Sequence, residues 1–200
     1  MDRVFPAHIR MKDHRQTVQT VKAHNEAVAR YAGERLLPLG LQKTGELAGL
    51  LHDMGKAKQE FADYLYAAVQ NPDCVKRGIV NHTFAAVRFL LERHHPAGPI
   101  DAACVTAELL AYADGAHHGL FDCIDEQHKS GFDYRKSKED IGYEEALENY
   151  LSQCADTEKL DELFDGATAE ITPFLEKLGT LPDAALPPEK ANAEIQFYYG

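Results

Sequence analysis

Apolar side chains recur at steps of three and four residues along most of the chain, which is the repeat of an amphipathic α-helix. This pattern predicts helices over residues 17–37, 44–54, 59–69, 81–94, 101–113, 139–153, 156–178 and 188–199. We expect residues 119–138 to form an irregular connection, and no segment shows the alternation of a strand. The sequence therefore predicts an all-α fold in which residues 1–200 form a single globular helical domain.

The composition is that of an ordinary globular domain. The chain has 200 residues, of which 44% are hydrophobic and 26% are charged. No apolar run approaches the roughly 18 residues that a membrane-spanning helix needs, and the N-terminus has no signal-peptide core. The four cysteines are widely spaced and form no CxxC pair, which excludes a zinc knuckle and a disulfide framework. We therefore expect a cytoplasmic protein with no membrane partner.

The charge is concentrated in one segment. The formal net charge is −11, and residues 139–176 contain 12 acidic residues against one basic residue, Lys159, which accounts for the whole excess. Residues 1–138 are close to neutral, with 17 acidic and 18 basic residues. We expect residues 139–178 to be a helical segment appended to the core, with a solvated acidic face or a docking surface for a basic partner. Since a broad basic groove is lacking, we expect weak binding of DNA by the chain alone.

A histidine and an aspartate stand side by side where an apolar helix ends. His52 and Asp53 directly follow Leu50 and Leu51. Burying a charged carboxylate beside leucines is costly unless a cation or strong donors compensate, and a divalent metal would do so through both side chains. Lys56 follows closely enough to contact a phosphate oxygen. The alternative is a plain helix C-terminus, where the dipole favours His52 and Asp53 closes a turn.

Four further histidines stand at helix ends or on a buried stripe. His117 and His118 end the most apolar helix. His82 lies in the first turn of another helix, and His24 falls on the apolar stripe of the first one. Each alone is more simply a polar end residue or a hydrogen-bonded core residue. Together with the pair described above they form a nitrogen-rich donor set that suits transition metals better than Ca²⁺. Because the set exceeds the needs of one four-coordinate ion, we expect two metal ions, bridged by the carboxylate, at the centre of the helix bundle.

The order of these motifs resembles that of the HD superfamily of metal-dependent phosphohydrolases. Residues 47–56 have the sequence LAGLLHDMGK and residues 115–122 have the sequence GAHHGLFD. Both look like the HD nuclease domain of the CRISPR-associated helicase–nuclease of type I systems. The double histidine is the more diagnostic half, because it is not general across HD proteins. Outside the motifs the resemblance is one of pattern, and it extends from the first predicted helix to the last.

The resemblance implies a metal-dependent deoxyribonuclease that cleaves single-stranded DNA in antiviral defence. Its cofactors would be two divalent ions, such as Mn²⁺, Fe²⁺, Co²⁺ or Ni²⁺, with Mg²⁺ as a further candidate. Its partners would be a helicase domain, in cis or in trans, and an RNA-guided surveillance complex. The residues carried over are His24, His52 and Asp53 for the first ion, Asp53, His82, His117 and His118 for the second, and Asp53 and Lys56 as catalytic residues.

Two departures from the family pattern affect these expectations. The family usually has a late aspartate that completes the first metal site, but here the helix expected before it starts near residue 193 and the chain stops at Gly200. Asp114, Asp122 and Asp161 are substitutes without the expected setting. We therefore expect a fragment of a longer chain with a C-terminal helicase, which binds one ion tightly and the other poorly. The second departure is that no GxxxxGK[ST] phosphate loop is present, so this chain has no ATPase activity of that kind.

Two other functions compete with the nuclease. One is an HD-type nucleotide or cyclic-nucleotide phosphohydrolase, and the other is an inactive fragment that serves as a docking module. The double histidine favours the nuclease over the phosphohydrolase.

Overall fold

The computed structural model describes residues 4–13, 15–72, 75–76, 78–118, 135, 138 and 141–179. In these ranges the chain is mostly helical, which confirms the predicted fold class at that level. None of their helices is long and apolar enough to cross a membrane. The helix predicted over 188–199 and nearly all of 119–138 lie outside the described ranges. The helices are α1 (Val21–Leu36), η1 (Leu37–Leu39), α2 (Gln42–Leu51), η2 (Met54–Lys56), α3 (Gln59–Gln70), α4 (Ala85–His94), α5 (Ala102–Ala116), α7 (Tyr143–Gln153) and α8 (Thr157–Gly179).

A β-hairpin precedes the first helix, where the sequence predicted no strand. Strand β1 (Pro6–Lys12) pairs antiparallel with β2 (Arg15–Thr20). The helix predicted from residue 17 therefore begins only at Val21, where the Thr20 hydroxyl accepts a hydrogen bond from the amide of Ala23 at 3.0 Å. The prediction was wrong because most side chains of this ribbon are exposed. A strand without a buried face does not need to alternate apolar and polar residues.

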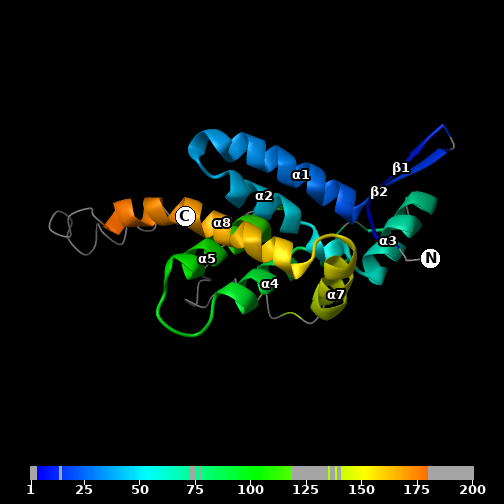
Figure 1. The fold of residues 1–200 in the computed structure, drawn as a ribbon. Coiled ribbons are helices and arrows are strands. Elements are labelled where there is room, and N and C mark those ends of the chain that lie inside the picture. The colour runs from blue at the N-terminus through cyan, green and yellow to red at the C-terminus, as the bar shows by residue number, and fades with distance from the viewer. Residues whose placement is uncertain are drawn as a thin grey trace, which may run out of the picture.

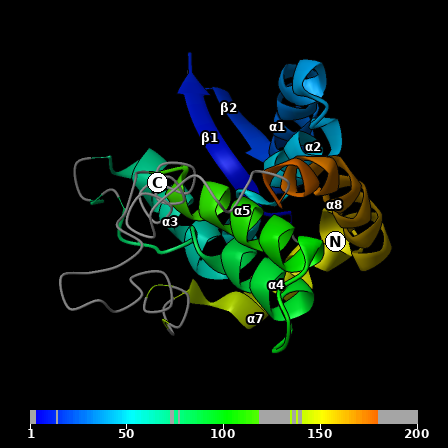
Figure 2. The same cartoon turned by 90° about the vertical axis from the view of Figure 1, so that its left-hand side faces the viewer.

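Close packing of two helices forms the base of the bundle. A Cβ atom built on Gly49 of α2 would lie 2.6 Å from the Cα atom of Ala29 in α1, so only glycine permits this approach. Helix α8 packs against α2 and α5, and the hairpin projects from one end of the bundle (Figure 1). Helices α4 and α5 lie side by side (Figure 2). This arrangement brings the ends of α2 and α5 and the start of α1 toward the hairpin.

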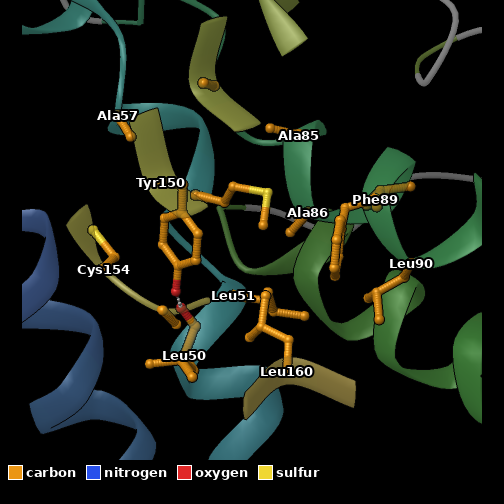
Figure 3. Packing of buried hydrophobic residues seen from close by; sticks show 14 of the residues in the cluster. Leu50, Leu51, Ala57, Ala85, Ala86, Phe89, Leu90, Tyr150, Cys154 and Leu160 are labelled. Atoms are coloured by element: carbon orange, nitrogen blue, oxygen red, sulfur yellow. Dashed lines mark hydrogen bonds between the residues drawn. The ribbon is translucent and has the colours of Figure 1, made fainter. Parts of the chain in front are cut away.

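The acidic segment is part of the core and is not appended to it. Tyr150 of α7 and Leu160 and Phe164 of α8 are at most 3% exposed, and they belong to the same apolar cluster as Leu50 of α2. The Tyr150 hydroxyl donates a hydrogen bond to the carbonyl oxygen of Leu50 (Figure 3). The prediction of an appended segment was based on its net charge. Net charge does not reveal a buried face, because an amphipathic helix can contain many acidic residues and still bury one side.

Carboxylates of the acidic helices close the N-termini of two other helices. Glu170 of α8 accepts hydrogen bonds from the amides of Lys43 at 2.8 Å and Thr44 at 2.9 Å, in the first turn of α2. Glu145 of α7 accepts one at 2.8 Å from the amide of Gln59, where α3 begins. A helix N-terminus has unpaired donors and the positive end of the dipole. These acids therefore support the fold, a role that the expected solvated or docking face did not include.

Candidate metal centre

Asp53 is the buried residue around which the histidines gather. Helix α2 ends at Leu51, and a turn leads into η2, so that Asp53 is only 1% exposed. Its Oδ2 atom lies 3.2 Å from Nε2 of His24 and 3.3 Å from Nε2 of His52. Those two nitrogens are 3.2 Å apart. The three residues predicted for the first metal ion are therefore in mutual contact.

The second predicted group faces the other carboxylate oxygen. Nε2 of His117 lies 3.9 Å from Oδ1 of Asp53, and the Nε2 atoms of His82 and His118 are 2.8 Å apart. A close backbone contact positions His82, because a Cβ atom on Gly55 would lie 2.0 Å from the His82 carbonyl oxygen. The structure thus brings together all the predicted metal ligands, which come from α1, the turn after α2, the segment before α4 and the end of α5.

Backbone carbonyl groups orient three of the imidazole rings. The Nδ1 atom lies 2.8 Å from Gly49 O in His52, 3.1 Å from Val80 O in His82 and 2.5 Å from Asp114 O in His117. Because a carbonyl oxygen only accepts hydrogen bonds, Nδ1 carries the proton and donates. When these rings are neutral, Nε2 presents a lone pair to the cluster. Metal-ligating histidines usually have this arrangement.

The protonation states of the cluster suit metal ligands. Burial lowers the pKa of His82 to about 4 and also lowers the pKa values of His117 and His118. Burial alone would raise the pKa of Asp53, but two neighbouring imidazoles and the charge of Lys56 hold it below its usual range. A carboxylate anion and neutral imidazoles near pH 7 are the forms that bind metal.

The donor set fits a divalent cation. Within the described ranges, the buried Oδ1 atom of Asp53 accepts no hydrogen bond, which is costly unless another group compensates. One ligand atom each from Asp53, His117 and His118 lie within 4.8 Å of one another, and the same holds for His8, His24 and Asp53. Both groups could therefore hold a metal ion. Nitrogen donors combined with a carboxylate suit a transition metal.

His8 was not among the residues predicted from the sequence. It lies on β1, and its ring meets the ring of His24 edge-on, with 4.6 Å between the centroids. No helical repeat or motif connects it to the other histidines. One feature of the sequence could have indicated its position. Residues 15–20 lead directly into the helix that contains His24, so a strand paired with them has one end beside the start of this helix.

Lys56 connects the cluster to a cavity of 1090 Å³. Its Nζ atom lies 2.8 Å from Oδ2 of Asp53, and its side chain is 7% exposed. The cavity is also lined by His82, His118 and the aromatic ring of Tyr64. A phosphate-bearing ligand in this cavity would meet both a lysine and two imidazoles of the second ligand group.

The aspartates considered as substitutes for the late ligand differ in their surroundings. Asp161 pairs with Arg93, with 2.6 Å between Oδ1 and Nε. Asp114 is buried, and its Oδ2 atom has no hydrogen-bond partner in the described part of the chain. Burial, together with the charge of Asp53, raises the pKa of Asp114 well above its usual value, which disfavours the anionic form that binds metal. Asp122 and residues 193–200 lie outside the described ranges.

No protein-family model matches this chain, and a comparison with curated proteins finds no similar sequence. The resemblance to HD proteins therefore depends on the motifs and on the site in which they meet.

Proposed function

We propose that this chain is an HD-type, metal-dependent nuclease that hydrolyses phosphodiester bonds of single-stranded DNA in CRISPR antiviral defence. The observation that carries the proposal is that one buried carboxylate joins two groups of imidazole nitrogens. His24 and His52 contact Oδ2 of Asp53, and His117 faces its Oδ1. A carboxylate shared by two nitrogen-rich groups is the arrangement that two-metal hydrolysis of phosphate esters needs.

Some side chains of the site would bind the metal ions, and one would contact the substrate. When bound, two divalent ions such as Mn²⁺, Fe²⁺, Co²⁺ or Ni²⁺ supply Lewis-acid activation of water and stabilise charge on the leaving oxygen. Asp53 is the shared ligand, and its burial keeps it in one orientation. Lys56 lines the cavity beside this carboxylate, from where its ammonium group contacts a phosphate oxygen of the substrate. The remaining ligands are His24 and His52 in the first group and His82, His117 and His118 in the second.

We further propose that a partner delivers the DNA strand to this site in the cytoplasm. Proteins that bind single strands by themselves use a positively charged groove, whereas residues 1–138 are nearly neutral. Among the residues that the structure describes, the lysines and arginines on the cavity lining are Lys56, Arg135 and Lys138. A helicase, in cis or in trans, working with an RNA-guided surveillance complex would supply the strand that this small basic surface cannot capture efficiently.

Cleavage of circular single-stranded DNA tests the proposal. The protein is stripped with a chelator and reloaded with Mn²⁺ or Ni²⁺, and the Asp53→Asn variant is treated in the same way. We expect linear and shorter products from the reloaded protein, and none from the stripped protein or the variant. A linear strand is included, because an enzyme that requires an end would leave circles intact. If circles and linear strands both survive the reloaded protein, the nuclease proposal fails.

A nucleotide phosphohydrolase is the second candidate function. Its support is the cavity beside the cluster, whose volume of 1090 Å³ lies just above the range of about 300–1000 Å³ that is typical of small-molecule pockets. Phe61 and Tyr64 on its lining offer aromatic faces to a base. Release of phosphate from a panel of nucleotides and cyclic nucleotides, with the DNA left intact, would favour this candidate over the nuclease.

A further inference from the structure

His8 lies at the edge of the histidine cluster, and its side chain makes no polar contact that would stabilise the fold within the described ranges. Its side chain is exposed and lines the cavity beside Lys56. Within the described ranges, neither of its ring nitrogens makes a hydrogen bond or an ion pair. A histidine that holds a hairpin together would instead be bonded to a neighbouring strand or to the core. Its position therefore calls for an explanation other than stability.

The hairpin positions the His8 side chain close to the first ligand group. The chain is anchored just before it, because the carbonyl oxygen of Phe5 accepts a hydrogen bond from the amide of Val21 at 2.9 Å. Phe5 and Ala7 are buried, at 6% and 1% exposure. The register of the hairpin shifts at Ala7, between the pairs Pro6–Thr20 and His8–Gln19, and beyond this irregularity the exposed ring of His8 meets His24.

The distances are those of groups that can share one ion. One ligand atom from each of His8, His24 and Asp53 lies within 4.8 Å of the others. Bonds of about 2.1 Å to a transition metal put two ligand atoms roughly 3–4 Å apart. Asp53 is buried, whereas His8 is exposed, so a small rotation of the His8 ring can bring its ligand atom into bonding distance. We propose that His8 is a ligand of the first metal ion, an inference that rests on the function proposed above.

This assignment changes the composition of the first site. With His8, the first ion would take His8, His24 and Asp53, whose ligand atoms lie within 4.8 Å of one another, and His52 adjoins this group with its Nε2 atom 3.3 Å from Oδ2 of Asp53. The second ion would take Asp53, His117 and His118, and His82 adjoins that group with its Nε2 atom 2.8 Å from Nε2 of His118. The late aspartate of the family pattern is then not needed for binding. We accordingly expect two ions at full occupancy, in place of one tight and one weak ion.

The test is metal binding and not only activity. The wild-type protein, His8→Ala and His8→Gln are stripped and loaded with Mn²⁺ or Co²⁺, and bound metal is measured by elemental analysis and calorimetry. Arg10→Ala is the matched control, because Arg10 is an exposed residue two positions further along the same strand. Circular dichroism confirms that each variant is folded, and the glutamine variant keeps the polar character of the position.

We expect both His8 variants to lose one ion, or to bind one ion at least tenfold more weakly, while Arg10→Ala matches the wild type. The visible spectrum of the Co²⁺ form should also change, because one imidazole leaves the coordination sphere. Two ions bound with unchanged affinity in both His8 variants would overturn the assignment and leave the proposed function intact. Absence of any bound divalent ion in the wild-type protein would overturn both.

Discussion

The histidine cluster around Asp53 and the acidic helices α7 and α8 differ in how their carboxylates are paired. In the acidic helices several carboxylates have partners within the protein. Glu170 and Glu145 accept hydrogen bonds from the starts of α2 and α3, and Asp161 pairs with Arg93. Around Asp53, imidazole nitrogens face one another, and the carboxylate is only half paired, because Oδ2 contacts three nitrogens whereas the buried Oδ1 has no hydrogen-bond donor among the described residues.

This difference separates the charged groups that stabilise the helix bundle from those that could bind a ligand. The net charge of −11 comes from residues 139–176, and part of that charge stabilises helix ends. The cluster belongs to the nearly neutral residues 1–138, where imidazole nitrogens converge on a carboxylate whose Oδ1 atom has no hydrogen-bond partner among the described residues. Substitutions in the acidic helices should therefore lower stability, and substitutions in the cluster should lower metal binding and activity.

The largest effect is expected for Asp53→Asn. An amide has nearly the same shape as a carboxylate but is a weak metal ligand, so both ligand groups lose their shared oxygen donor. We expect DNA cleavage to fall at least about 1000-fold, equivalent to about 4 kcal/mol of transition-state stabilisation, together with loss of bound metal. Cleavage rates and elemental analysis measure the two effects. The exposed Asp63→Asn on α3 is the control, and unchanged metal content in Asp53→Asn would contradict the site.

A smaller effect on activity is expected for Lys56→Met. Its Nζ atom lies 2.8 Å from Oδ2 of Asp53, where it competes with a cation for the same oxygen. Its loss should leave the number of bound ions unchanged, because lysine is not a ligand. Loss of its contact with the substrate should slow cleavage by about 10–100-fold. Cleavage rates at saturating metal test this, and Lys56→Arg should recover part of the activity. Wild-type rates in Lys56→Met would show that the lysine is only structural.

In the acidic helices, Glu170→Ala should destabilise the protein without affecting metal binding. The substitution leaves the amides of Lys43 and Thr44 without their acceptor, and removing a helix N-terminal acceptor costs about 1–2 kcal/mol. Urea unfolding in the presence of a chelator measures the change. Glu176→Ala has the same change of charge at an exposed position of α8, and its effect should stay within about 0.5 kcal/mol. Equal stability of the two variants would contradict the structural role of Glu170.

The smallest effect is expected from pH, and it belongs to the cluster. Burial lowers the pKa of His82 to about 4, whereas an unfolded histidine has a pKa of about 6.5. Between these values the unfolded chain binds a proton that the folded chain does not, so stability should fall as the pH drops through this window. For the stripped protein we expect the contribution of His82, measured as the stability difference between the wild-type protein and His82→Gln, to fall by about 1 kcal/mol between pH 7.5 and 5.5. Urea unfolding at both values tests this, and a smaller loss is expected in His82→Gln.

Much of the helical framework was predictable because it depends on local patterns. The apolar repeat located α1, α2, α3, α4 and α5 to within a few residues, and the Asp101 side chain accepts a hydrogen bond from the Cys104 amide at 2.9 Å, as its position before the helix predicts. The start of α4 was placed at residue 81, but it begins at Ala85. One reason is that the carbonyl oxygen of Asn81 accepts a hydrogen bond from the distant Lys58 side chain at 2.8 Å.

The sequence alone determined which residue types could form a metal site, because the capacity of histidine and aspartate to coordinate metal is a property of the side chain and their placement at helix ends is a local property. Only the tertiary structure decided that His8 joins His24, and that Glu170 supports a helix start 126 residues earlier at Thr44. The physical reason is the same in both cases. A hairpin register and a contact between distant helices depend on packing that involves the whole chain, and no local pattern of residues encodes them.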